Sequence, residues 1–117
     1  MRIDKDLVAA SATPLVLGIL ADGDSYGYAI IKRVKDLSGG QLEWSDGMLY
    51  PLLHRLEQSG LVRAEWSTSA GARRRKHYML TEGGRAALAE RQSQWAMIST
   101  VLGQVWNPNT GRPAWGI

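Results

Sequence analysis

The chain of 117 residues contains no cysteine and only two histidines, His54 and His77. The absence of cysteine excludes disulfide bonds, thiolate zinc ligands and thiol catalysis, and it agrees with an intracellular protein. No neighbouring histidines or carboxylates have the spacing of metal ligands on one face of a helix. We therefore expect the protein to work without a metal ion and without a cofactor.

The sequence also lacks a long apolar run and the motifs of an active site. The apolar stretch near the N-terminus follows Asp4 and Asp6 and is interrupted by Pro14 and Gly18, which argues against a signal peptide or a membrane span. No nucleophile with a neighbouring base, phosphate-binding glycine motif or helically spaced pair of carboxylates is present. These absences argue against an enzyme, and we expect a cytoplasmic protein with one compact domain.

The distribution of positive charge is more informative than its total. The net charge is only +3, which does not by itself indicate a nucleic-acid partner. Four consecutive basic residues, Arg73, Arg74, Arg75 and Lys76, nevertheless follow a segment with the composition of a loop. Such a block is typical of a surface that contacts phosphates.

Apolar residues at helical spacing predict two helices in the first part of the chain. The first covers about residues 5–21, and Pro14 is expected to kink or break it. The second begins after an N-cap at Asp24 or Ser25 and ends at Gly39. Two helices joined by a short turn are therefore expected.

A third helix is marked by Ser45, a residue type that caps helices, and by Asp46, whose charge suits the positive end of the helix dipole. Pro51 is expected to loosen the first turn, because proline lacks the N–H group that bonds to an earlier carbonyl. The stripe expected to be buried consists of four leucines, Leu49, Leu52, Leu53 and Leu56. His54 and Arg55 then lie on the outward face.

Alternating apolar and polar residues predict strands at 61–66 and 76–80, joined as an antiparallel hairpin with a basic tip. Thr81 is expected to cap a long last helix that ends at Asn107 and Pro108. Apolar residues recur in this helix with the heptad spacing of a helix that packs against a partner, at Leu88, Trp95, Ile98, Leu102 and Val105. The pattern predicts a homodimer.

Three helices followed by a basic hairpin have the order of a winged helix-turn-helix. In this motif the third helix enters the major groove of DNA, and the hairpin, or wing, lies beside it. We therefore expect a mainly α fold with a small β-hairpin. Residues 1–81 form the expected DNA-binding domain, residues 82–107 the dimerisation helix and residues 108–117 a flexible tail.

Three ordered motifs carry a resemblance to a known family. They are SYGYAIIKR from Ser25, GMLYPLLHRLEQSGLV from Gly47 and RRRKHYMLTEGG from Arg73. Over about residues 5–105 the chain resembles the PadR family of transcriptional repressors, and its short last helix is similar to that of the compact, multidrug-responsive branch. Met48 departs from the family pattern, which usually has threonine or another small polar residue there.

The resemblance implies a set of DNA-contacting residues: Tyr26, Tyr28, Tyr50, Arg55, Arg73, Arg74, Arg75 and Lys76. Their hydroxyl, guanidinium and ammonium groups suit phosphate contacts, which orient a protein on DNA without reading its sequence. Arg55 and His54 are the candidates for contact with base edges. Two alternatives remain open, since the tyrosines could pack between helices and the arginines could serve only to keep a loop soluble.

The resemblance also implies that the last helix pairs with the first and last helices of a second subunit. Trp95 falls where multidrug-binding relatives place a tryptophan that, with its twin, sandwiches flat aromatic ligands, and its large rigid face suits stacking and cation–π contact. The residues expected around it are Leu7, Ser11, Pro14, Gln92 and Ser99. The alternative is that Trp95 only fills the dimer interface.

The expected function is therefore that of a homodimeric repressor on a palindromic double-stranded operator, released by a small planar aromatic or cationic ligand. A second hypothesis is a winged-helix module that binds another protein without sensing a ligand. The basic block and the exposed Arg55 argue against this second hypothesis. No role is derived for Trp106 or Trp115.

Overall fold

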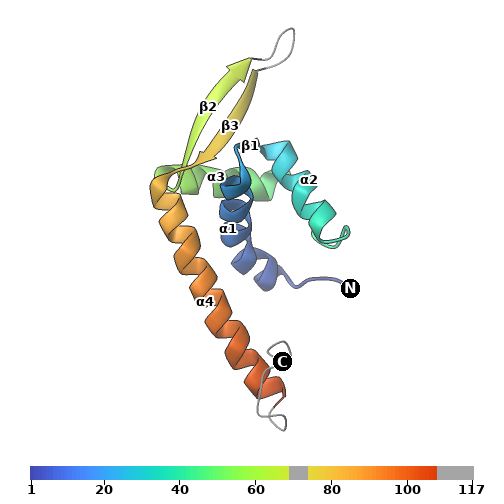
Figure 1. Cartoon of the computed structure of the whole chain (residues 1–117). Helices are drawn as coiled ribbons and strands as arrows, with labels where there is room; N and C mark the ends of the chain where they lie inside the picture. Colours follow the sequence, from blue (N-terminus) through green and yellow to red (C-terminus); the bar gives the residue numbers. More distant parts are fainter. Residues whose placement is uncertain (69–73, 108–117) are drawn as a thin grey trace.

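A computed structural model describes residues 1–68 and 74–107 of the chain. Four helices and three strands follow one another as α1 (Lys5–Asp22), β1 (Ser25–Tyr26), α2 (Gly27–Leu37), α3 (Asp46–Gln58), β2 (Val62–Thr68), β3 (Arg74–Leu80) and α4 (Glu82–Trp106). The strands form one antiparallel sheet in the order β1-β3-β2. The predicted winged helix-turn-helix order and the mainly helical fold are confirmed (Figure 1).

Helix α1 is continuous through Pro14, so the predicted break is wrong. Proline removes one backbone hydrogen bond from the helix. On the C-terminal side of Pro14 the helix buries Val16, Leu17 and Leu20 almost completely in the core. Burial of three such side chains is worth more than one hydrogen bond, so the helix persists.

Helix α2 begins later than predicted, at Gly27, and neither Asp24 nor Ser25 is its N-cap. Ser25 and Tyr26 instead form β1, which pairs with Tyr78 and His77 of β3. A strand of two residues has no periodicity, so the sequence pattern could not indicate it. Pairing with β3 satisfies backbone groups of Ser25 and Tyr26, and no side chain caps α2.

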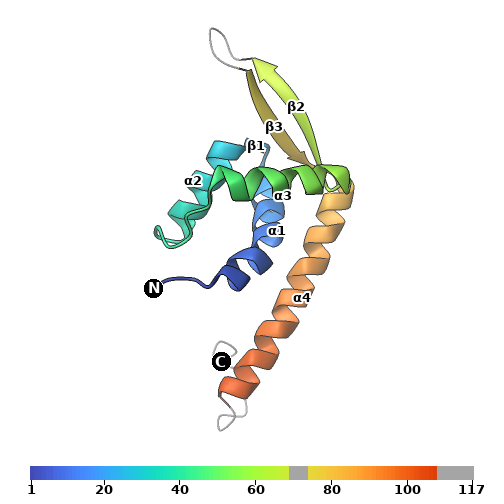
Figure 2. The ribbon, with the colours of Figure 1, turned by 180° about the vertical axis from the view of Figure 1, so that it is seen from behind.

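Helix α3 has the N-cap and the buried leucine stripe that the sequence predicted. The Met48 amide donates a hydrogen bond of 3.2 Å to Ser45 Oγ, so Ser45 is the N-cap. The four leucines of the predicted stripe, Leu49, Leu52, Leu53 and Leu56, are all buried. Pro51 is exposed within the same helix, which runs on to Gln58 without interruption. In the view turned by 180° from Figure 1, α3 lies nearest the viewer, below the two strands of the wing (Figure 2).

Helix α4 starts where Thr81 was expected to cap it, with the Gly84 amide donating to Thr81 Oγ1 over 3.0 Å. The Thr81 hydroxyl in turn donates to the carbonyl of Gly60 over 2.6 Å, which ties the start of α4 to the end of α3. A Cβ at Gly84 would fall on the Leu61 carbonyl, so this position requires glycine. From this fixed origin α4 extends beyond the other elements (Figure 1).

In the described part of the chain, no helix combines the length and apolarity needed to cross a membrane. Within the same residues, no three histidine or acidic side chains come together as metal ligands.

Candidate nucleic-acid interface

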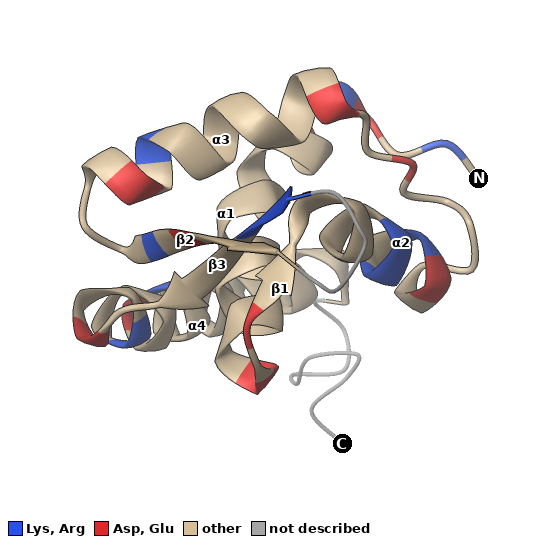
Figure 3. Cartoon of the chain, turned by 90° about the horizontal axis from the view of Figure 1, so that it is seen from above, with Lys and Arg blue, Asp and Glu red and all other residues tan. Residues whose placement is uncertain are grey.

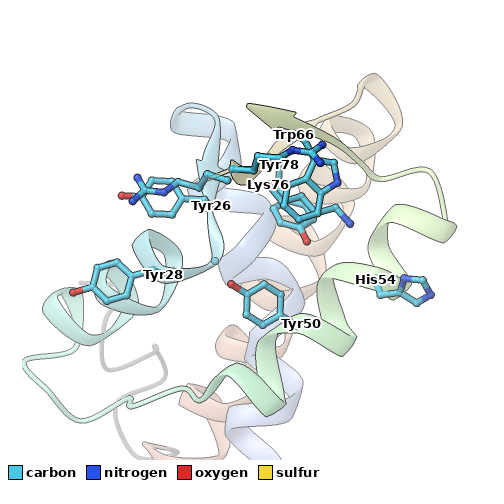
Figure 4. A pocket seen from close by; sticks show the side chains of 10 residues that line it. Tyr26, Tyr28, Tyr50, His54, Trp66, Lys76 and Tyr78 are labelled. Carbon is cyan, nitrogen blue, oxygen red and sulfur yellow. The ribbon is translucent and has the colours of Figure 1, made fainter. Parts of the chain in front are cut away.

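The wing and α3 enclose an open hollow of about 970 Å³, named here the wing cleft (Figure 4). Seven residues that the sequence marked as DNA contacts line it: Tyr26, Tyr28, Tyr50, His54, Arg74, Arg75 and Lys76. They come from β1, the start of α2, the outward face of α3 and the outer half of β3. Residues far apart in the sequence therefore form one surface that combines aromatic rings with positive charge.

The other two expected DNA contacts are Arg55 and Arg73. Arg55 is exposed on α3 but is not among the residues that line the wing cleft. Arg73 lies outside the described residues. In the view from above, the outer end of β3 is basic and lies between α3 and α2 (Figure 3).

Arg74, Arg75 and Lys76 of β3 each lie over an aromatic ring. The Arg75 guanidinium is 4.1 Å from the centre of the Tyr26 ring, and the Arg74 guanidinium is 5.0 Å from the centre of the Trp66 ring. The Lys76 ammonium is 5.5 Å from the Tyr78 ring. These distances are within the range of cation–π attraction, so the rings help to orient the charges.

The ammonium of Lys76 also has a carboxylate partner. Its Nζ lies 3.5 Å from Glu57 Oε1 of α3, and both side chains are about one-third exposed. The Tyr78 side chain beneath them is buried, and this burial raises the pKa of its hydroxyl above the ordinary value, while Lys76 acts in the opposite direction. Lys76 therefore connects the outer half of β3 to α3, and its charge is partly compensated by Glu57.

The three tyrosines predicted to touch DNA have different surroundings. Tyr50 packs so closely on Gly27 that a Cβ at Gly27 would fall on its hydroxyl group. Tyr26 makes an edge-on contact with His77, with ring centres 5.6 Å apart, and also supports Arg75. Tyr28 is 68% exposed at the start of α2. Packing therefore accounts for part of the role of Tyr26 and Tyr50, but not for Tyr28.

A second group of expected site residues meets between α1 and α4. Ser11, Pro14, Gln92 and Trp95 line one hollow of about 320 Å³, named here the Trp95 hollow. Leu7 lines an adjoining hollow of about 340 Å³, together with Ser11 and Trp95. Ser99 lines neither hollow. Arg91, which the sequence did not indicate, also borders the Trp95 hollow and brings a positive charge to it.

The residues expected at a dimer interface divide into two groups. Leu88 is partly buried against the core of its own chain, and Trp95 is half-buried. Ile98, Leu102 and Val105 are exposed by 50%, 37% and 67%. The same part of α4 exposes three further large apolar residues, Met97, Val101 and Trp106. A single chain therefore leaves the C-terminal half of α4 with uncovered apolar side chains.

Sequence reasoning missed two residues of the wing cleft region. Trp66 lines the cleft from β2, and Glu57 approaches it through Lys76. The alternation that predicted β2 places Trp66 on the same face as the buried Val62, so the pattern contained a signal for Trp66. No sequence pattern could indicate Glu57, because its contact joins α3 to β3 and depends on how these elements pack.

The fold and the basic, aromatic cleft beside the third helix define a winged helix-turn-helix protein of the DNA-binding class. The model of the transcriptional regulator PadR-like family matches residues 16–90, and the chain belongs to this family. The family resemblance that the sequence motifs suggested is thereby confirmed. The proteins of this family are regulators of transcription and not enzymes.

Individual relatives agree with this assignment. The chain is 38% identical over 89 residues to the transcriptional regulator Rv3488 of Mycobacterium tuberculosis. The matched region covers 75% of this chain and 79% of that protein. The chain is 33% identical over 84 residues to the transcriptional regulator YqjI of Escherichia coli, covering 72% of this chain but only 39% of that protein. A PadR family regulator from Eggerthella lenta has a similar crystal structure, with a TM-score of 0.79 and 33% identity over 89% of this chain and 88% of that chain.

Proposed function

We propose that this chain is a repressor that binds a palindromic double-stranded operator as a homodimer and is released by a planar aromatic ligand. The observation that carries the DNA-binding part is the wing cleft, where the outer half of β3 and the outward face of α3 present cations and hydrogen-bond donors side by side. A wing on the phosphates and a helix in the major groove require this arrangement.

The two wing arginines, Arg74 and Arg75, supply the phosphate contacts in this proposal. Both are exposed, and among the described residues neither has a carboxylate partner within ion-pair distance. Each can therefore neutralise a phosphate without first breaking an ion pair. Because such contacts release counterions, the affinity for DNA falls steeply as salt rises.

Recognition of the DNA sequence is assigned to the outward face of α3. His54 and Arg55 are both exposed there, one turn or more beyond the N-terminus of the helix. Arginine forms paired hydrogen bonds to guanine, and histidine can donate or accept at a base edge. Met48, in the first turn, is partly buried against the core and offers no polar contact.

The dimer is assigned to α4, with residues 1–81 as the DNA-binding domain and residues 82–107 as the dimerisation helix. The exposed apolar residues of its C-terminal half support this assignment, because a patch of this kind is typical of an interaction site. Two subunits related by a twofold axis place two copies of α3 on a palindrome.

The ligand site is assigned to the Trp95 hollow. Its lining combines the Trp95 ring with apolar side chains and a few polar groups such as Gln92, which is the usual character of a small-molecule site. Arg91 at its border favours a neutral or anionic planar ligand over a cationic one. A second copy of the hollow across the dimer axis then completes the site around the ligand.

The test of DNA binding is titration of the chain with random duplex DNA at several salt concentrations, followed by selection of an operator from a randomised pool. We expect salt-dependent binding and enrichment of a palindrome. Absence of any salt-dependent binding at low ionic strength would refute the proposal and would favour the module that binds another protein.

A further inference from the structure

Trp66 is a large aromatic residue on the wing that contributes little to the core. Its side chain is 57% exposed, whereas Val62 and Tyr78 on the same face of the sheet are nearly completely buried. The buried residues lie at the base of the wing, and Trp66 lies further out, where the face turns towards the wing cleft (Figure 4). Packing of the hydrophobic core therefore does not explain a tryptophan at this position.

The neighbours of Trp66 are cations of the opposite strand. Its cross-strand partner in the sheet is Lys76, whose ammonium lies 6.0 Å from the centre of the indole ring. The Arg74 guanidinium lies 5.0 Å from the same ring. An isolated exposed tryptophan needs no explanation, but one that lines the wing cleft and holds two cations there indicates a function.

We infer that Trp66 is a positioning residue for DNA binding, which holds the Arg74 guanidinium towards the wing cleft before DNA arrives. The inference rests on the proposed DNA-binding function. An arginine side chain without a partner loses much conformational freedom when it is fixed on a phosphate. The indole ring removes part of that freedom in the free protein, so that less affinity is lost on binding.

Arg74 depends on Trp66 more than the other two cations do. Arg75 lies over Tyr26, and Lys76 is held by Glu57 and by the Tyr78 ring. Among the described residues, Trp66 supplies the side-chain contact that holds the Arg74 guanidinium. Replacing Trp66 therefore removes the aromatic contact of Arg74, whereas Arg75 keeps Tyr26, and Lys76 loses its longer contact with the indole ring but keeps Glu57 and the Tyr78 ring.

The experiment compares Trp66→Leu and Trp66→Phe with the unchanged chain. Leucine keeps apolar bulk without an aromatic face, and phenylalanine keeps a smaller aromatic face. We expect Trp66→Leu to weaken DNA binding about two- to fivefold for each wing, or roughly four- to twenty-five-fold when two wings bind one operator, with most of the affinity restored in Trp66→Phe. Thermal unfolding should be nearly unchanged, because the side chain is largely exposed.

A double-mutant cycle with Arg74→Gln shows whether the effect passes through Arg74. In the Arg74→Gln background, Trp66→Leu should have less than a twofold effect. Equal effects in both backgrounds would overturn the inference. So would an unchanged affinity of Trp66→Leu in a chain that still unfolds normally and whose parent binds DNA.

A measurement without DNA separates this inference from the proposed function. In the free protein, the Nε–Hε signal of Arg74 in a proton–nitrogen NMR spectrum should be shifted by the Trp66 ring current. The shift should disappear in Trp66→Leu and become smaller in Trp66→Phe. Assignment comes from the signal lost in Arg74→Gln. An Arg74 signal that does not respond to either substitution would show that the ring does not hold the guanidinium, whether or not the chain binds DNA.

Discussion

The wing cleft and the surface of α4 differ in whether their side chains find partners within a single chain. In the wing cleft, every described cation of β3 has a partner within the same chain, either an aromatic ring or a carboxylate. Along the C-terminal half of α4, by contrast, apolar side chains such as Val105 and Trp106 are 67% exposed. The first surface is prepared for a polar, charged partner and the second for an apolar one.

This difference has a consequence for how the two surfaces act. A cleft whose charges are already oriented can bind DNA without a large rearrangement, so its affinity depends on a few side chains. The α4 surface is an interface only when a second apolar surface covers it. The Trp95 hollow is bordered by α1 and α4, so in the proposed function a ligand bound there changes the pairing of the subunits and hence the spacing of their wings.

The largest effect is expected from removal of the charges of Arg74 and Arg75, the two arginines of the wing cleft for which the described residues supply no carboxylate partner. Arg74→Gln combined with Arg75→Gln should weaken binding to duplex DNA roughly a thousandfold in a dimer, because four charge-assisted contacts to phosphate are lost. The slope of log affinity against log salt should become shallower by about 0.9 for each lost phosphate contact. Fluorescence anisotropy over a salt series measures both quantities.

Arg63→Gln is the matched control for the wing. Arg63 belongs to β2 of the same hairpin, but it lies next to Glu65 and Met79 and does not line the wing cleft. Removing this charge should change DNA affinity less than about threefold. If Arg63→Gln weakened binding as much as the two cleft substitutions, overall charge and not the cleft would determine affinity.

The next effect concerns the surface of α4. Val105→Asp places a carboxylate in the proposed interface, where burial without a partner is strongly unfavourable. The dimer should dissociate to monomers, and affinity for a palindromic operator should fall roughly a hundredfold because the two wings are no longer linked. Sedimentation equilibrium measures the oligomeric state directly.

Ser93→Asp provides the control on α4. Ser93 is exposed on the side of the helix away from Ile98 and Leu102, so the same charge there should leave the oligomeric state unchanged. A dimer that survives Val105→Asp, or a chain that is monomeric without any substitution, would contradict the assignment of α4 as the dimerisation helix.

A smaller effect is expected in the Trp95 hollow. Trp95→Ala should weaken binding of a planar aromatic dye about tenfold or more, because the stacking surface is lost, while DNA affinity should stay within a few-fold. Comparison of a neutral flavin with a cationic acridine, by isothermal titration calorimetry, tests the influence of Arg91. Dye binding that persists in Trp95→Ala would place the ligand elsewhere, and stronger binding of the acridine would show that Arg91 does not select against positive charge.

The sequence predicted the elements whose signals are local. Ser45 and Thr81 were identified as N-caps from residue type, and the leucine stripe of α3 from its spacing, and the structure has all of them. The strand β1 and the late start of α2 were missed because they depend on pairing with β3, which is more than fifty residues away. Local patterns do not contain information about such contacts.

In the candidate site too, residues with local signals were predicted and contacts between distant elements were not. Basic and aromatic residue types indicated most of the wing cleft, because the charges and rings that bind phosphate are recognisable as such. The pairing of each cation with its ring was not predictable from the sequence. Arg75 of β3 contacts Tyr26 of the neighbouring strand β1, and Arg74 of β3 contacts Trp66 of the neighbouring strand β2. These contacts depend on the register of β3 with its neighbours.

The smallest expected effect, about threefold on DNA affinity, separates packing from direct contact at Tyr50. In Gly27→Ala, the new methyl group must displace the Tyr50 ring, which now lies against Gly27. Tyr50→Phe removes only the hydroxyl group and keeps the packing. If the hydroxyl contacts phosphate, both variants should lose affinity by a similar factor, but only Gly27→Ala should lower the melting temperature. If Tyr50 only packs α3 against α2, Tyr50→Phe should bind DNA as the unchanged chain does. Anisotropy titrations at one salt concentration, together with thermal unfolding followed by circular dichroism, distinguish these outcomes.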